Sequence, residues 1–217
     1  LMDAGFKVDH HYMPNLPGAT PEKDVAMMKE VFDNPDFRPD QVKIYPTIAN
    51  EYAELSKWHE DGRWKSYTDP ELMEMGIKIK ENIPYYVRIN RFIRDIPKES
   101  IIAGNDITNL RELVQQEMKR RGLKCKCIRC REARNKTTNL EEAKLYIDED
   151  EASKGREYFI SFENDDRSVL YAFIRLRFPS QFFSNGKFGE YKLSYPHDEI
   201  PEIQNAALVR ELHTVSY

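Results

Sequence analysis

All three cysteines of the 217-residue chain lie within six residues, at Cys125, Cys127 and Cys130. Lysine and arginine side chains stand between and beside them, and positive charge stabilises the thiolate form that binds metal ions. Zinc is the usual metal of a structural thiolate site inside cells, and it takes four ligands. The spacing therefore predicts a structural zinc site that needs one ligand besides the cysteines.

A histidine is the expected fourth ligand. We favour His197, because the segment Tyr195-Pro196-His197-Asp198 is typical of an exposed loop. The other candidates are His10, His11, His59 and His213. Two other interpretations of the cysteines stay open, a metal-free group of thiols and a [4Fe–4S] cluster. Radical-SAM clusters use wider cysteine spacing than C-x-C-x-x-C, which argues against the cluster.

The cysteines lie in a strongly basic stretch. Residues 88–136 hold 14 Lys and Arg against six Asp and Glu, a net charge of +8, whereas the rest of the chain carries −12. Such a density of positive charge attracts phosphate and gives affinity for nucleic acids through counterion release. The side chains predicted to contact RNA are Arg88, Arg91, Arg94, Lys119, Arg120, Arg121, Lys124, Lys126 and Arg129. The alternative is that these charges only solvate helix and strand faces.

The first part of the chain has the pattern of a β-loop-α-β unit. It predicts a strand at residues 6–8, a helix from about Pro21 to Phe32 and a strand at 42–46. Units of this kind build parallel sheets and barrels, whose chemistry sits on the loops after the strands. Further predicted elements are helices at 51–58, 69–81 and 109–121 and a strand at 86–89.

The last part of the chain has a different period. Residues 157–163, 169–178 and 207–217 alternate apolar and polar side chains, which predicts a mainly antiparallel sheet. The acidic segment from Ala133 to Lys154 is either a linker or the first element of this second unit. Neither a long apolar run nor a signal-peptide pattern is present, so we expect a soluble cytoplasmic protein without a membrane anchor. We also expect that the true start of the protein lies upstream of Leu1.

Six short motifs together resemble one family. They are Met13-Pro14-Asn15-Leu16-Pro17, Phe37-Arg38-Pro39-Asp40, Lys43-Ile44-Tyr45-Pro46-Thr47, Arg94-Asp95-Ile96-Pro97, Asn109-Leu110-Arg111 and Arg210-Glu211-Leu212-His213. In this order they resemble the catalytic subunit of Elongator, which converts the wobble uridine of tRNA to 5-carboxymethyluridine. The resemblance runs from Ala4 to His213.

The resemblance implies an α/β fold class with three segments. Residues 1–97 would form the C-terminal part of a radical-SAM β/α barrel, and 98–136 a basic, zinc-stapled linker. Residues 137–217 would form the first part of a GNAT-like α+β sheet, as in acetyltransferases. The cysteines would then hold the linker in shape and would not be the catalytic cluster.

The resemblance also implies cofactors, partners and site residues. The family uses S-adenosylmethionine, a [4Fe–4S] cluster and acetyl-CoA to modify the anticodon region of tRNA, and further partners would be a second copy of the chain or other Elongator subunits. Lys43, Tyr45 and His10 would act in catalysis, with a structural hydrogen bond as the alternative role of His10. The strand residues expected at acetyl-CoA are Glu211, Leu212, His213 and Thr214.

By the same comparison, the radical-SAM cysteines would precede Leu1 and the loop that binds the CoA pyrophosphate would follow Tyr217. We therefore expect this chain to be a central portion of the enzyme and inactive alone. Two alternative functions stay open. One is a protein lysine acetyltransferase, against which the +8 segment argues because a basic peptide needs an acidic groove. The other is a non-catalytic RNA-binding module.

Overall fold

The computed structural model describes residues 1–93, 96–107, 109–134, 139–180, 183–184, 187–188 and 206–215. The chain divides into two compact units, each of which we describe by itself. The parallel-sheet unit comprises Asp9–Val31 and Gln41–Cys127. The antiparallel-sheet unit comprises Leu1–Val8, Phe32–Asp40 and Ile128–Tyr217. These units do not coincide with the three segments expected from the sequence, whose boundaries at residues 97 and 136 stay a prediction.

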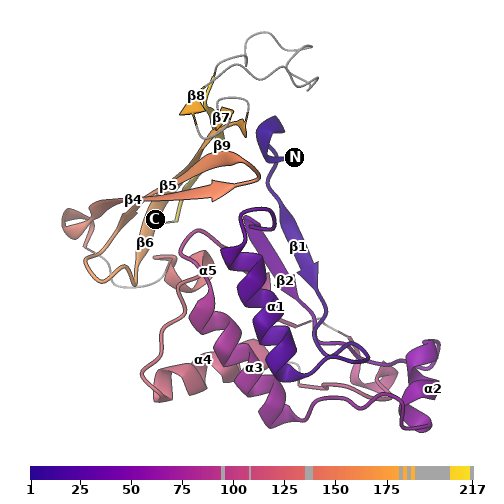
Figure 1. Cartoon of the computed structure of the whole chain (residues 1–217). Coiled ribbons are helices and arrows are strands. Elements are labelled where there is room, and N and C mark those ends of the chain that lie inside the picture. The colour runs from indigo at the N-terminus through magenta and orange to yellow at the C-terminus, as the bar shows by residue number, and fades with distance from the viewer. Residues whose placement is uncertain are drawn as a thin grey trace. The chain divides into compact units, whose positions relative to one another are not determined.

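Three parallel strands form the sheet of the first unit, in the order β1-β2-β3. Figure 1 shows β1 and β2 side by side. They are β1 at Asp9–Tyr12, β2 at Gln41–Ile44 and β3 at Arg88–Arg91. Helix α1, at Pro21–Asp33, connects the first two strands as the β-loop-α-β pattern predicts. One face of this sheet packs into the core, because Val42, Ile44 and Ile89 are fully buried. The alternate residues must therefore project from the opposite face.

The helices of this unit are α2 at Glu54–Glu60, α3 at Asp69–Asn82 and α4 at Leu110–Arg120. Helix α3 begins with a capping box, in which the Glu71 carboxylate accepts hydrogen bonds from the backbone N–H and the hydroxyl of Thr68. Helices α3 and α4 pack closely at Gly76, where a Cβ would lie 2.9 Å from Phe92 and 3.1 Å from Val114. No larger residue fits there without displacing its neighbours.

The second unit contains a four-stranded antiparallel sheet in the order β4-β5-β6-β9. Its strands are β4 at Lys144–Ala152, β5 at Gly155–Glu163, β6 at Leu170–Phe178 and β9 at Leu208–Thr214. The unit also contains the short pair β7 at Phe183–Ser184 and β8 at Lys187–Phe188, and helix α5 at Ile128–Arg131. Three single-turn 3₁₀ helices, at Met2–Ala4, Lys98–Ser100 and Leu140–Glu142, complete the described elements.

Arginines fill positions in the antiparallel sheet where apolar residues are usual. Arg175 and Arg177 of β6 and Arg210 of β9 have between 0% and 3% of their side chains exposed. Each is paired with carboxylates of the same unit, among them Asp3, Asp40 and Glu157. Buried charges persist only when they are paired and hydrogen-bonded in this way. The ion pairs thus fasten the sheet to the segments Leu1–Val8 and Phe32–Asp40 of its own unit.

The predicted helices and strands are largely confirmed, with one difference. The strand predicted at residues 6–8 is wrong, because the chain pairs with β2 only from Asp9 to Tyr12. His10 and His11, which would follow a strand at residues 6–8, therefore lie within β1 itself. Of the two interpretations of residues 133–154, the structure favours the second, because the acidic segment supplies β4, the first strand of the second sheet. In the part of the chain that the structure describes, no helix has the length and apolar composition of a membrane span.

Candidate active site and metal centre

Lys43 lies on the face of the parallel sheet that does not pack into the core. Its Nζ is 3.0 Å from Oδ2 of Asp9 and 2.9 Å from Nε2 of His11. The parallel register explains this contact, since His11 pairs with Lys43 and Asp9 pairs with Gln41. The strands thus gather a carboxylate, an imidazole and an ammonium group in one place. Such a group can bind an anion or move a proton.

Tyr45 follows β2 directly and extends this group toward the carboxyl end of the sheet. Its ring meets the ring of His11 edge to face, with centroids 5.9 Å apart and an angle of 86°. Tyr45 also lines a cavity of about 130 Å³. The other lining residues are Met13, Pro46, Ile48, Asn50, Ile93, Ile96, Ile101 and Asn105. Met13 follows β1 and Ile93 follows β3, so the cavity lies where all three strands end, the usual position of an active site in such sheets.

The structure does not bring His10 to Lys43. His10 pairs in register with the fully buried Val42, so it faces the other side of the sheet. There its Nδ1 lies 2.8 Å from the hydroxyl of Tyr12, whose pKa burial raises to about 12. The structural hydrogen bond considered for His10 is therefore present. Sequence reasoning missed Asp9, which alternation with His11 could have indicated, and Asn105, which no motif or spacing marks.

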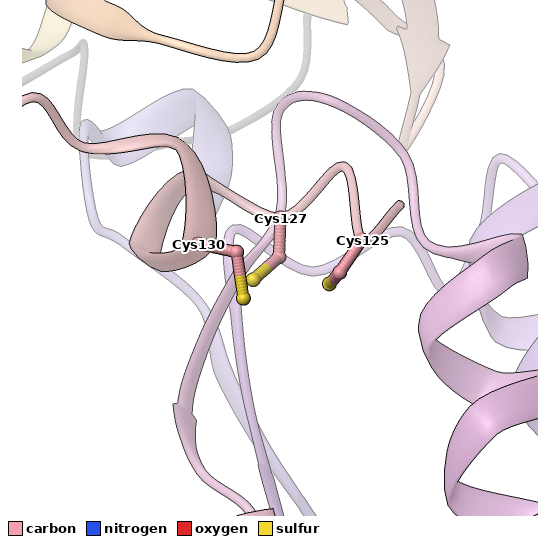
Figure 2. A group of neighbouring side chains, drawn as sticks. All are labelled: Cys125, Cys127 and Cys130. Atoms are coloured by element: carbon pink, nitrogen blue, oxygen red, sulfur yellow. The ribbon is translucent and has the colours of Figure 1, made fainter. Parts of the chain in front are cut away.

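The three cysteines converge as their spacing predicts. Their sulfur atoms all lie within 4.8 Å of one another, and Cys127 is buried whereas Cys125 and Cys130 are half-buried. Figure 2 shows the three side chains pointing toward one spot, Cys130 from helix α5 and the other two from the loop that precedes it. Three converging sulfurs suit a tetrahedral thiophilic ion. His197, the expected fourth ligand, lies outside the described residues.

The basic residues predicted to contact RNA lie mainly on the surface. Those described are Arg88, Arg91, Lys119, Arg120, Arg121, Lys124, Lys126 and Arg129, all exposed except the half-buried Arg88, while Arg94 lies outside the described residues. Near the end of α4, Glu117 accepts hydrogen bonds from both Arg120 and Arg121. These bonds lower the pKa of Glu117 to about 2, so its charge offsets part of the basic surface.

The residues expected at acetyl-CoA lie on β9, at the edge of the antiparallel sheet as far as the structure describes it. Leu212, His213 and Thr214 are exposed there. Glu211 differs, because its carboxylate binds Arg175 and Lys7. Burial alone would raise the pKa of Glu211, but these two cations lower it below the usual value. Glu211 therefore has a structural role in the described unit.

Comparison with known proteins gives consistent results. The Radical_SAM C-terminal domain matches residues 39–120. A tRNA uridine(34) acetyltransferase of Methanocaldococcus jannaschii is 41% identical over 219 residues, which cover 98% of this chain and 38% of that protein. Elongator complex protein 3 of Saccharomyces cerevisiae is 35% identical over 220 residues, which cover 97% of this chain and 36% of that protein. The solved structure of Methanocaldococcus infernus Elp3 with an N-terminal deletion matches with a TM-score of 0.82 at 38% identity, over 100% of this chain and 49% of that one.

The chain belongs to the Elongator catalytic subunit family. It spans well under half the length of the curated relatives it matches. In this member of the Elongator family, the matched radical-SAM segment includes Lys43, Tyr45 and every cavity residue except Met13. The resemblance carried by the six sequence motifs is confirmed.

Proposed function

We propose that the protein of which this sequence forms part converts the wobble uridine of tRNA to 5-carboxymethyluridine. The observation that carries the proposal is the cavity at the carboxyl ends of β1, β2 and β3, beside Lys43 and Tyr45, in a chain whose relatives are named for uridine(34) of tRNA. S-adenosylmethionine, a [4Fe–4S] cluster and acetyl-CoA, when bound, would supply the radical and the two carbons that are transferred.

We assign Lys43 and Tyr45 to the reaction. Lys43 is charged and held between Asp9 and His11, so it can hold an anionic or carbonyl oxygen without moving. Tyr45 lines the cavity and carries an aromatic ring, the kind of surface on which an unpaired base can stack. His10, predicted with them, faces away from Lys43, and His11 is the histidine that contacts both residues.

The antiparallel sheet supports the acetyltransferase-like part of the proposal. One face of this sheet exposes large apolar side chains, with Leu145, Ile147 and Leu212 each more than half exposed. A sheet hydrophobic on both faces needs a second layer, which the helices of a GNAT-like domain would supply. The exposed residues of β9 would then meet acetyl-CoA.

The basic surface would bind the tRNA anticodon region, and zinc bound by the cysteines would hold the segment between Cys125 and Cys130 in shape.

The test uses the full-length protein with tRNA, acetyl-CoA, S-adenosylmethionine and a low-potential reductant, followed by mass spectrometry of the nucleosides. We expect 5-carboxymethyluridine with the wild type and its loss with Lys43→Met. His11→Gln should lower the rate more than His10→Gln, because only His11 contacts Lys43. Acetylation of lysine peptides without any modified uridine would contradict the proposal and favour the protein acetyltransferase.

A further inference from the structure

The cavity at the strand ends contains an unused hydrogen-bond donor. Asn105 lines the cavity and is only 6% exposed. Its Oδ1 accepts a hydrogen bond of 2.5 Å from the backbone N–H of Ile107, which fixes the orientation of the amide. Its Nδ2 has no partner among the described residues. A buried amide without a partner costs free energy, so a ligand atom that accepts from Nδ2 would be bound favourably.

The segment that carries Asn105 is fastened in place. Ala49 and Ala103 form an antiparallel bridge, in which the Ala49 N–H donates to the Ala103 carbonyl over 2.7 Å and the Ala49 carbonyl accepts from Ile102 over 2.9 Å. Gly104 then passes so close to Ile48 that a Cβ would lie 2.8 Å from the Ile48 Cα. Asn105 is thereby held against the loop that follows β2. The donor is preorganised before any ligand arrives.

The size of the cavity limits what it can hold. Cavities for drug-sized ligands are about 300 to 1,000 Å³, whereas a cavity of about 150 Å³ with apolar walls holds one benzene ring. At about 130 Å³, this cavity is close in size to one that takes a single ring and lies well below the range for ligands as large as a whole nucleoside. Its walls are mostly apolar, and the lining includes Ile93, Ile96 and Ile101 together with Tyr45. Apolar walls, an aromatic residue and the buried amide donor of Asn105, with the exposed Asn50 as the other lining amide, suit a flat ring that carries a carbonyl group.

We infer that this cavity holds the uracil ring of the target nucleotide, turned out of the RNA, and that Asn105 donates a hydrogen bond to its C4 carbonyl. Asn105 is then the residue that selects uracil over cytosine. Cytosine carries an amino group at C4, and an amino group would face the Asn105 N–H without an acceptor between them. This inference rests on the proposed function, because it takes uridine as the substrate. It adds the residue that reads the base.

Sites that read a base or substrate through a buried hydrogen bond discriminate strongly against an analogue that leaves the site unpaired. Enzymes that act on a base commonly bind the flipped base in a close-fitting pocket in this way. The sugar and phosphates would remain outside the cavity. Only the ring needs to enter.

The test compares anticodon stem-loop RNAs with uridine or cytidine at the wobble position, bound to the full-length protein at pH 8. We expect the wild type to prefer the uridine RNA and Asn105→Asp to lose at least ten-fold of that preference. Aspartate keeps the acceptor for Ile107 N–H but replaces the donor with an acceptor. The matched control is Asn82→Asp, which adds the same charge at an exposed residue of the same unit outside the cavity. Its base preference should stay that of the wild type.

A second variant keeps the inference testable if aspartate perturbs the fold. Ile96→Phe fills the cavity from its wall, leaves Asn105 unchanged and should weaken the uridine RNA more than the cytidine RNA. An unchanged preference in both variants, with folding verified by circular dichroism, would overturn the inference while the proposed function stands. Weaker binding of S-adenosylmethionine with an unchanged base preference would also overturn it, since the cavity would then hold the adenine ring. A wild type that neither modifies uridine nor prefers it would refute the proposed function itself.

Discussion

The guanidinium group of Arg210 binds the carboxylate of Asp40 through two parallel hydrogen bonds, Nη1 to Oδ2 at 2.8 Å and Nη2 to Oδ1 at 2.7 Å. Both side chains are at least 97% buried, and they are 170 residues apart in the chain. Arg210 also binds Glu157 on β5. This arrangement ties β9 to the segment Phe32–Asp40 of the same unit, and it joins two of the motifs by which the family was recognised.

Removing Arg210 should destabilise the protein strongly. In Arg210→Met, the Asp40 carboxylate stays buried without its bidentate partner, which typically costs about 3 to 5 kcal/mol. Urea unfolding followed by circular dichroism measures the loss. The control is Arg120→Met, which removes an exposed ion pair and should change stability little. Equal losses in the two variants would contradict the role of Arg210.

The same pair predicts a dependence of stability on pH. Burial alone would raise the pKa of Asp40, but hydrogen bonds from Arg210 and the charges of Arg175 and Arg210 outweigh it and lower the pKa. A lowered pKa stabilises the fold fully above the unfolded value of about 3.9, and this stability is lost as the pH falls through the folded value. The free-energy gap between wild type and Asp40→Asn should therefore be constant above about pH 5 and shrink between about pH 4 and pH 2. A free-energy gap that widens on acidification would argue against a lowered pKa of Asp40 in the folded protein.

Glu117 should restrain RNA binding, because it holds Arg120 and Arg121. We expect Glu117→Gln to raise the affinity for tRNA a few-fold. Replacement of Lys119, Arg120 and Arg121 by Glu should lower the affinity for tRNA. It should also make the slope of log affinity against log salt concentration less steep, by roughly 0.7 to 0.9 for each phosphate that is no longer neutralised. Filter binding at several salt concentrations measures both effects. As a control, three exposed lysines of the same unit are replaced by Glu, namely Lys57, Lys65 and Lys78. If the α4 surface binds tRNA, this control should lose less affinity than the variant at residues 119–121.

The cysteines should bind one zinc ion per chain. Cys127→Ser removes the buried ligand and should abolish zinc in elemental analysis of the purified protein, with a lower melting temperature. Lys126→Ala, a change between two of the cysteines, should keep the metal. Loss of iron in place of zinc in the serine variant would show that the cysteines hold an iron–sulfur cluster. Wild-type protein without either metal, but well folded, would refute a metal site.

Gly104 should be required for the shape of the cavity at the strand ends. Gly104→Ala places a Cβ 2.8 Å from the Ile48 Cα at a φ of +120°, whereas Gly62→Ala has a φ of +79° and open space. Both variants strain the backbone, and Gly104→Ala adds the clash and a φ further from the left-handed region open to L residues, which together should cost about 1 to 3 kcal/mol more at Gly104. Thermal unfolding of the two variants measures it. Equal melting temperatures would mean that the segment can shift at no cost.

The sequence by itself determined the local structure and the type of chemistry. Helix α1 follows from the apolar spacing at Val25, Met28 and Phe32, and the start of α3 from Thr68 and Glu71, because periodicity and capping are local properties. The cysteine cluster is also local, since its three members lie within six residues, but the sulfurs converge to within 4.8 Å only because the segment turns into helix α5.

Only the tertiary structure decided which distant residues meet. His10 and His11 are adjacent in sequence and equally suited to catalysis by type, but the register of β1 against β2 gives only His11 to Lys43. The unpaired Nδ2 of Asn105 and the burial of Arg210 on Asp40 depend on contacts between segments far apart in the chain. Such contacts are set by strand register and burial, which no local pattern encodes. For that reason the sequence could indicate what chemistry the protein contains, and only the fold could show where it is assembled.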